Sequence, residues 1–483
     1  MRKHTIYTIL AILLLGDLCY SFLQHYHMPL DGDISEIILP SKGSTYYQVL
    51  QDPFGIGVLT KDTAYANPNR FFAHYSASLY MKQMPLILQV FVNPIDSIYL
   101  SSAILKTVVQ IVMLYLLSVC ISKSGNIFRA DFILAAILIT PLFQASGYNS
   151  YIGIIDQSII YTFFYALPLT LLLVYFLPFY RAWMNGQPTH FNWVLRVSFV
   201  ILIIILSFNG PLIPGIIVII CPLILFHAWW GNFRKIDDIN LFKRLIHSMV
   251  AIPGDLIFFF LISICMSLYS LYLGTHNLLN ESVKIPLLEL YRRLPLGFFY
   301  QFTEKAAFPL ILLVIVVNLF LMRKRSGDAK VQKILILARW IGVFSILYIL
   351  LLPLGGYRVY RPNVLRYDTI MPVTVCLIFL FGISTHFLIK HLPRRVNYVY
   401  ITSIVLILLA FARADEPRFQ ENRCEKKALQ LIADSPDTIV HLSQDCHVMS
   451  WNNITDIKDS ERNASLLLYW GVTPKKTLYY QSE

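Results

Sequence analysis

Residues 5–24 read TIYTILAILLLGDLCYSFLQ, an almost unbroken apolar run. About 20 such residues form a helix long enough to cross the hydrocarbon core of a bilayer. Arg2 and Lys3 precede the run, and no cleavage site flanked by small residues follows it. We therefore interpret this segment as a signal anchor that stays in the membrane.

The rest of the chain has the same apolar character. It is 56% hydrophobic and only 14% charged, whereas soluble domains have about 25% charged residues. Apolar runs of similar length recur, and they predict an all-α polytopic membrane protein with about 11 transmembrane helices. The predicted spans are residues 5–24, 97–121, 131–146, 154–179, 193–208, 211–229, 248–273, 306–322, 334–353, 369–388 and 396–412.

The distribution of Lys and Arg predicts the orientation. The segments between spans fall alternately on the two sides of the membrane. Lys and Arg are more frequent in the segments on the same side as the N-terminus than in those on the other side. We predict a cytoplasmic N-terminus and an outside C-terminus, in the inner (plasma) membrane of a bacterium with the functional face outside the cytoplasm. Much of the net charge of +12 comes from the Lys and Arg residues that set this orientation, so the charge indicates no nucleic-acid partner.

Most of the chain outside the lipid is predicted to lie on the outer face. Residues 25–96 form a long first loop, in which the aromatic-rich segment 67–92 is typical of helices lying flat at the interface. Residues 274–305 form a second outer loop with an amphipathic segment. Residues 413–483 alternate apolar runs with turns, which predicts a small soluble α/β domain after a transmembrane domain at 1–412.

An acidic stretch, HMPLDGDISEIILP, follows the first span. It contains Asp31, Asp33 and Glu36. Two carboxylates spaced as D-x-D can converge on a divalent cation or a sugar hydroxyl, and one can act as a general base. If the site holds a metal ion, Asp31 and Asp33 are its expected ligands. The alternative is a solvated acidic turn, because D-G-D is also a common turn sequence.

A basic stretch, PLGGYRVYRPNVLRYDTIMP, lies between the ninth and tenth predicted spans. Arg358, Arg361 and Arg366 alternate there with Tyr357 and Tyr360, on the side of the membrane where basic residues are otherwise sparse. Arginine binds phosphate through two parallel hydrogen bonds, so these residues are candidates for binding a lipid phosphate. The alternative is that they reach towards lipid headgroups without a specific ligand. A secondary basic surface is expected in the second outer loop, from Arg292, Arg293 and Lys305.

Two pairings of distant residues are also predicted. Asp17 and Lys106 lie at similar depths in the first two spans, where a structural ion pair would offset the cost of burying each charge in lipid. Cys424 and Cys446 both fall in the outside tail and could form a disulfide in an oxidising compartment. Two free thiols are the alternative for this cysteine pair.

The acidic motif after the first helix, the long first loop with interfacial segments, the many spans and the soluble C-terminal tail together resemble the C-type glycosyltransferase fold. Members of this family are integral-membrane enzymes that use sugars linked to polyprenyl phosphate or diphosphate. The resemblance implies a glycosyltransferase that moves a sugar from a polyprenyl-phosphate-type lipid to a glycan, lipid or protein acceptor on the outer face. It places the catalytic carboxylates at Asp31, Asp33 and Glu36.

Two other functional classes fit the same residues. A transporter or flippase of a phosphate-bearing lipid or glycolipid could use the arginines to bind the headgroup during translocation. A non-catalytic membrane assembly protein is the third class.

Overall fold

The computed structural model describes residues 3–145, 152–187, 189, 191–236, 240–281, 285–303, 306–325, 327–356 and 363–482. Most of them are helical. The longer helices are α1 (Lys3–Tyr26), α5 (Phe71–Leu88), α6 (Pro94–Ser122), α7 (Ala130–Ile139), α9 (Leu167–Asn185), α10 (Trp193–Ser207), α11 (Ile213–Phe233), α12 (Leu241–Val250), α13 (Gly254–Gly274), α15 (Leu287–Thr303), α16 (Ala307–Arg323), α17 (Ala329–Leu351), α18 (Tyr367–His391) and α19 (Arg394–Ala414). The shorter elements among them are α2 (Ile34–Ile38), α3 (Thr45–Gln51), α4 (Ile56–Lys61), η1 (Thr140–Leu142), α8 (Ile159–Tyr161), η2 (Thr162–Ala166), α14 (Leu278–Glu281) and η3 (Leu352–Gly355).

The helices have the lengths and composition of membrane spans. Within the described ranges, eight are long and apolar enough to cross a membrane, and a ninth candidate is the pair α15 and α16, which meet at 81°. Ala130–Leu142 and Trp193–Ser207 are shorter apolar helices. Each predicted span overlaps one of these helices. The prediction of an all-α, multi-pass membrane protein is therefore confirmed.

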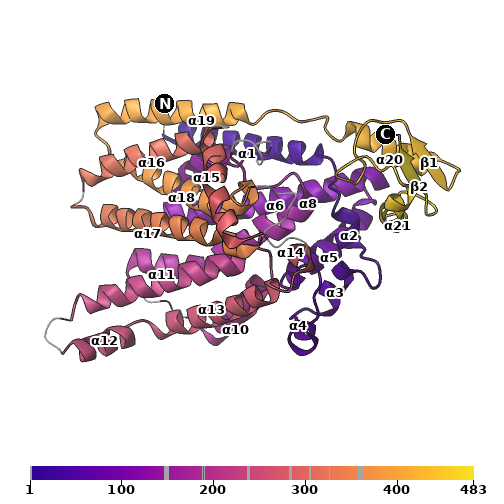
Figure 1. Ribbon diagram of the computed structural model, residues 1–483. Coiled ribbons are helices and arrows are strands. Elements are labelled where there is room, and N and C mark those ends of the chain that lie inside the picture. The colour runs from indigo at the N-terminus through magenta and orange to yellow at the C-terminus, as the bar shows by residue number, and fades with distance from the viewer. Residues whose placement is uncertain are drawn as a thin grey trace.

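The helices differ in how far they are enclosed by their neighbours. α6 and α18 are buried over most of their length, whereas α1 and α19 are largely exposed. In Figure 1, α1 and α19 run along one edge of the helical layer. Helix α6 begins at Pro94, directly after Asn93, whose side chain accepts a hydrogen bond from the backbone N–H of Asp96.

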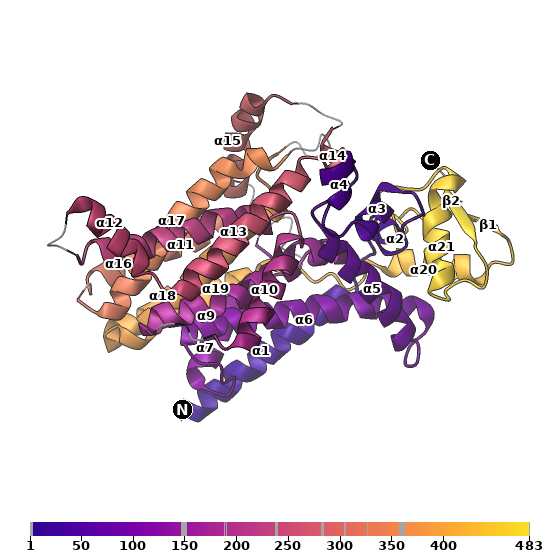
Figure 2. The same ribbon diagram turned by 90° about the horizontal axis from the view of Figure 1, so that it is seen from below.

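The first loop and the C-terminal domain lie side by side at one end of the long helices (Figures 1 and 2). The start of the segment 274–305 joins them there, because the backbone N–H of Asn67 donates to Oδ1 of Asn277 at 3.0 Å. At the end of α5, Val90 and Phe91 are each 80% exposed. Two such apolar side chains suit a segment that lies in the membrane interface, as predicted for this loop.

The C-terminal residues form a small α/β unit. It consists of α20 (Arg423–Asp434), β1 (Ile439–Leu442), η4 (Ile457–Ser460), α21 (Glu461–Tyr469) and β2 (Leu478–Gln481). The two strands pair in parallel, with Ile439 opposite Leu478. A disulfide joins Cys424 to Cys446, so these residues form the predicted bond rather than two free thiols.

This C-terminal unit is attached to the end of α1 and to α5. The backbone N–H of Asn422 donates to the carbonyl of His27 at 2.9 Å, and its side chain donates to the carbonyl of Tyr26 at 2.8 Å. The buried Trp470 donates from its indole to the carbonyl of Met81 at 2.8 Å. The C-terminal unit and the N-terminus therefore lie at opposite ends of α1.

Candidate functional site

The acidic stretch lies at the junction between the end of α1, the N-terminus of α8 and the C-terminal unit. Asp31 is buried there. Its Oδ2 accepts hydrogen bonds from the hydroxyl of Ser158 at 2.8 Å and from the backbone N–H of Ile160 at 3.4 Å. Its Oδ1 accepts from the backbone N–H of Asp33 at 3.1 Å. Asp31 therefore shapes a turn, as the alternative interpretation proposed, but it does so as a buried group and not a solvated one.

Burial also changes the acidity of Asp31. Loss of contact with water raises its pKa to about 6, and the neighbouring charge of Asp33 acts in the same direction. The hydrogen bonds from Ser158 and Ile160 and the nearby charge of Lys106 oppose this rise. Asp31 therefore holds its proton more tightly than an exposed aspartate does.

Asp33 is in a different environment from Asp31. It is half-buried, and its Oδ1 accepts a hydrogen bond from Nε1 of Trp451 at 3.2 Å. Its other carboxylate oxygen has no hydrogen-bond partner among the described residues. The ring of Trp451 is 49% exposed, and its centroid lies 6.1 Å from that of Tyr161. A carboxylate with one available oxygen beside an exposed aromatic ring is suited to bind a ligand that has both hydroxyl groups and an apolar face.

The glycine in the D-G-D motif permits this arrangement. A Cβ on Gly32 would lie 2.6 Å from both the backbone nitrogen and Cδ1 of Trp451. Such a distance is far inside van der Waals contact, so any larger residue would push the C-terminal unit away from Asp33.

Glu36 is separated from the other two carboxylates by its partner. It forms an ion pair with Arg462 of α21, so it holds the C-terminal unit in place instead of converging on Asp31 and Asp33. The described residues include no group of three or more His, Cys, Asp or Glu placed to bind a metal ion. We therefore derive no step through a divalent cation.

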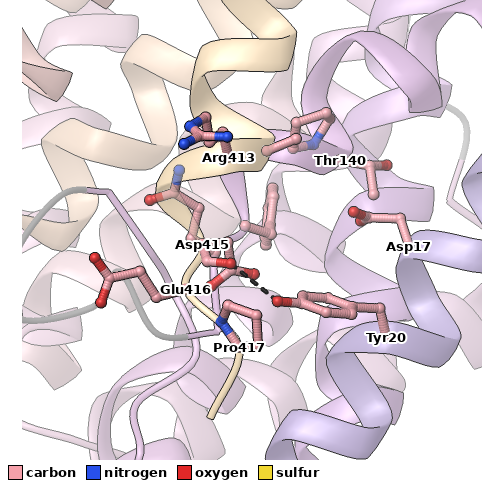
Figure 3. A pocket seen from close by; sticks show the side chains of 11 residues that line it. Asp17, Tyr20, Thr140, Arg413, Asp415, Glu416 and Pro417 are labelled. Carbon is pink, nitrogen blue, oxygen red and sulfur yellow. Dashed lines mark hydrogen bonds between the residues drawn. The ribbon is translucent and has the colours of Figure 1, made fainter.

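Lys106 does not pair with Asp17. Its ammonium group donates to the carbonyl of Gln157 and interacts with the charges of Asp156 and Asp31. Asp17 lies instead near Asp415 (Figure 3). The predicted ion pair was therefore wrong: equal depth in two helices says nothing about which way each side chain points.

The structure describes only part of the predicted basic cluster. Arg366 forms two hydrogen bonds with Asp368, from Nε to Oδ1 at 3.0 Å and from Nη2 to Oδ2 at 2.8 Å. Asp368 also accepts a hydrogen bond from the hydroxyl of Tyr165 at 3.2 Å. The other members of the cluster lie outside the described residues: Tyr357, Arg358, Tyr360 and Arg361.

The secondary basic surface is also described in part. Arg293 pairs with Glu289 at 3.1 Å, one turn away on α15, and Arg292 is exposed on the same helix. Lys305 lies outside the described residues.

One short helical segment connects the acidic stretch to Arg366. Ser158, which donates to Asp31, also caps α8 by accepting from the backbone N–H of Tyr161 at 3.1 Å. The following turn, η2, is a π-helix, and it carries Tyr165 to Asp368. Wide turns of this kind often occur at functional sites. Two clusters that are more than 300 positions apart in the sequence thus flank the same segment.

Glu425 joins the C-terminal unit to the acidic stretch. Its carboxylate accepts hydrogen bonds from the backbone N–H groups of Leu30 and Met449, each at 2.8 Å, and from the hydroxyl of Tyr99 at 2.7 Å. Burial raises its pKa to about 7, although these three donors favour the charged form. Sequence reasoning missed both Glu425 and Trp451, because neither stands in a motif. The only available signal was an acid beside a disulfide cysteine, on a helix with an apolar face.

No protein-family profile matches the chain, and no curated protein matches it.

Proposed function

We propose that this protein is a membrane glycosyltransferase. It would move a sugar from a polyprenyl-phosphate-type lipid donor to an acceptor hydroxyl on the outer face of the membrane. The observation that carries the proposal is the position of Asp33: a half-buried carboxylate, one oxygen of which has no partner among the described residues, next to the exposed ring of Trp451. Glycosyl transfer needs a base close to a surface that binds sugar, and these two residues provide both.

In the proposed reaction, Asp33 takes the proton of the acceptor hydroxyl. The acceptor oxygen forms a bond to the anomeric carbon as the bond from that carbon to the lipid phosphate breaks. The lipid phosphate leaves with the bonding electron pair. Asp31 positions Asp33, because its Oδ1 binds the backbone N–H of Asp33 and its Oδ2 holds Ser158.

The arginines would stabilise the departing phosphate. Arg366 forms an ion pair with Asp368, so its guanidinium is oriented but its charge is already balanced by that carboxylate. In the proposal, Arg358 and Arg361 therefore carry the main phosphate contacts, with Tyr357 and Tyr360 as hydrogen-bond donors.

The proposal includes a topology. The chain would cross the inner membrane of a bacterium eleven times, with its N-terminus in the cytoplasm and the C-terminal unit outside. The attachment of that unit at the end of α1 opposite the N-terminus supports this arrangement.

The test compares Asp33→Asn with the matched variant Asp62→Asn, an exposed aspartate in the same loop. Each protein is reconstituted in lipid and supplied with a panel of polyprenyl-phosphate and polyprenyl-diphosphate sugars, with a membrane extract as the source of acceptors. Release of the polyprenyl phosphate or diphosphate is measured. We expect roughly 10²–10⁴-fold slower release from Asp33→Asn, as for the loss of a general base, and wild-type rates from Asp62→Asn. Wild-type turnover by Asp33→Asn would contradict the mechanism.

A further inference from the structure

A cavity of about 340 Å³ lies where the C-terminal unit meets the end of α1, within the size range of small-ligand pockets. Its lining includes the residue that follows α1, a residue of the segment after α19, and three residues of α20, namely His27, Phe419, Arg423, Lys426 and Lys427. Helix α1 is apolar and long enough to cross a membrane, and it ends one residue before His27. The cavity therefore lies at the level of a membrane surface.

The basic side chains of α20 give this cavity a positive charge. Three of them line it, and its described lining residues include no carboxylate. Lys426 is balanced by Asp96, whose Oδ1 lies 2.7 Å from its Nζ. Arg423 and Lys427 are exposed, and neither side chain forms a hydrogen bond or an ion pair within the described part of the chain. Two uncompensated positive charges in one cavity favour an anionic ligand.

An exposed aromatic ring connects this cavity to the surface of α1. The ring of Phe419 is 37% exposed, and its centroid lies 6.0 Å from that of His27 and 5.5 Å from that of Tyr20. Tyr20 lies within the span, which is largely exposed along its length, and Leu23 near its end is 48% exposed. An aromatic ring between a charged cavity and an apolar helix surface suits the junction of a lipid headgroup with its acyl chains.

A lipid would use both features of the cavity, whereas a soluble anion would use only its charge. Arginine binds phosphate through two parallel hydrogen bonds, and lysine adds a compact positive charge. We propose that this cavity binds the headgroup of an anionic phospholipid from the leaflet at this end of α1. The phosphate contacts Arg423 and Lys427, and the start of the acyl chains lies against Phe419. The site shares no residue with the groups proposed for glycosyl transfer, so the two proposals are independent.

The experiment measures lipid binding to the purified full-length protein by native mass spectrometry. The probes are phosphatidylglycerol, which has one net negative charge, and phosphatidylcholine, which has the same phosphate but no net charge. We expect phosphatidylglycerol to bind at least about five-fold more tightly, the contribution of one basic residue near an anionic lipid. Soluble glycerol 3-phosphate, which has no acyl chains, is the competitor. It should displace the lipid only in more than about ten-fold excess, because it makes no apolar contact.

The variants Arg423→Gln and Lys427→Gln assign the binding to this cavity. Both side chains are exposed, so the fold should tolerate each change, and each should weaken phosphatidylglycerol binding about five-fold. The matched control is Lys458→Gln, at an exposed lysine of the same C-terminal unit that does not line the cavity, and it should leave binding unchanged. Equal affinity for the two lipids, unchanged binding in both cavity variants, an equal loss in Lys458→Gln, or displacement by an equal concentration of glycerol 3-phosphate would overturn the proposal.

Discussion

Nε1 of Trp451 lies 3.2 Å from Oδ1 of Asp33, and the two residues are 418 positions apart in the sequence. One belongs to the turn that follows the first helix, and the other to the C-terminal unit. The hydrogen bond directs one oxygen of Asp33 towards the protein and leaves the other available. The candidate site is therefore complete only when the C-terminal unit is docked on the end of α1.

The first prediction concerns the ring of Trp451. Trp451→Ala removes the exposed aromatic surface, and we expect KM for the sugar substrate to rise about ten-fold, since an aromatic contact contributes about 1–1.5 kcal/mol. Trp451→Phe retains a ring and should restore most of the affinity. Trp193→Ala, at a Trp that is 74% exposed on α10, is the control. An equal KM for Trp451→Ala and the wild type would show that the ring does not contact substrate.

The second prediction concerns Glu425 and pH. Burial raises its pKa from the ordinary glutamate value of 4.5 to about 7 in the folded protein, so the folded chain binds this proton more tightly than the unfolded chain does. The free energy of unfolding should therefore fall as pH rises from about 4.5 to about 7. Thermal unfolding of the purified protein at several pH values across this range measures the slope of the free energy of unfolding against pH.

Glu425→Gln provides the comparison for that slope. The amide has no titrating proton, so the contribution of this group to the pH dependence should disappear. The variant should also be less stable by about 1–3 kcal/mol. Its NH₂ group would replace one of the two oxygens that accept hydrogen bonds from backbone N–H groups, and one of those N–H groups would lose its acceptor. A variant with the same pH profile as the wild type would show that Glu425 does not titrate in this range.

The third prediction concerns Gly32. Gly32→Ala places a methyl group 2.6 Å from Trp451, and we expect the docking of the C-terminal unit to weaken by about 1–3 kcal/mol, as for other overpacked sites. Faster proteolysis in the segment that follows α19 would report the loosened unit. Gly16→Ala is the matched control, because no atom lies within 4 Å of the Cβ that it adds on α1. Equal cleavage rates in the two variants would contradict the close contact.

The fourth prediction concerns orientation. Gln430 is exposed on α20 and Lys330 is exposed near the start of α17, so cysteines at these positions are accessible to reagents in water. In intact cells, an impermeant maleimide should label Gln430→Cys above the wild-type background and leave Lys330→Cys at that background. The reverse pattern would place the acidic stretch and the C-terminal unit in the cytoplasm.

The sequence alone determined where the helices lie along the chain. Long apolar runs such as residues 5–24 form helices because the backbone must satisfy its own hydrogen bonds in lipid, and this requirement is local. Helix α15 could also be predicted, from the amphipathic pattern of its residues. The pairing of Cys424 with Cys446 could be proposed, because only these two cysteines were predicted to lie outside the membrane.

Only the tertiary structure decided which side chains meet. The depths of Asp17 and Lys106 could be read from the sequence, but the rotation of each helix placed one beside Asp415 and the other beside Asp156. The same holds for Asp33 and Trp451, whose contact depends on how the C-terminal unit docks on α1. The period of a hydrophobic run identifies a helix and its buried face, but the partner of a polar group is set by packing between segments far apart in the chain.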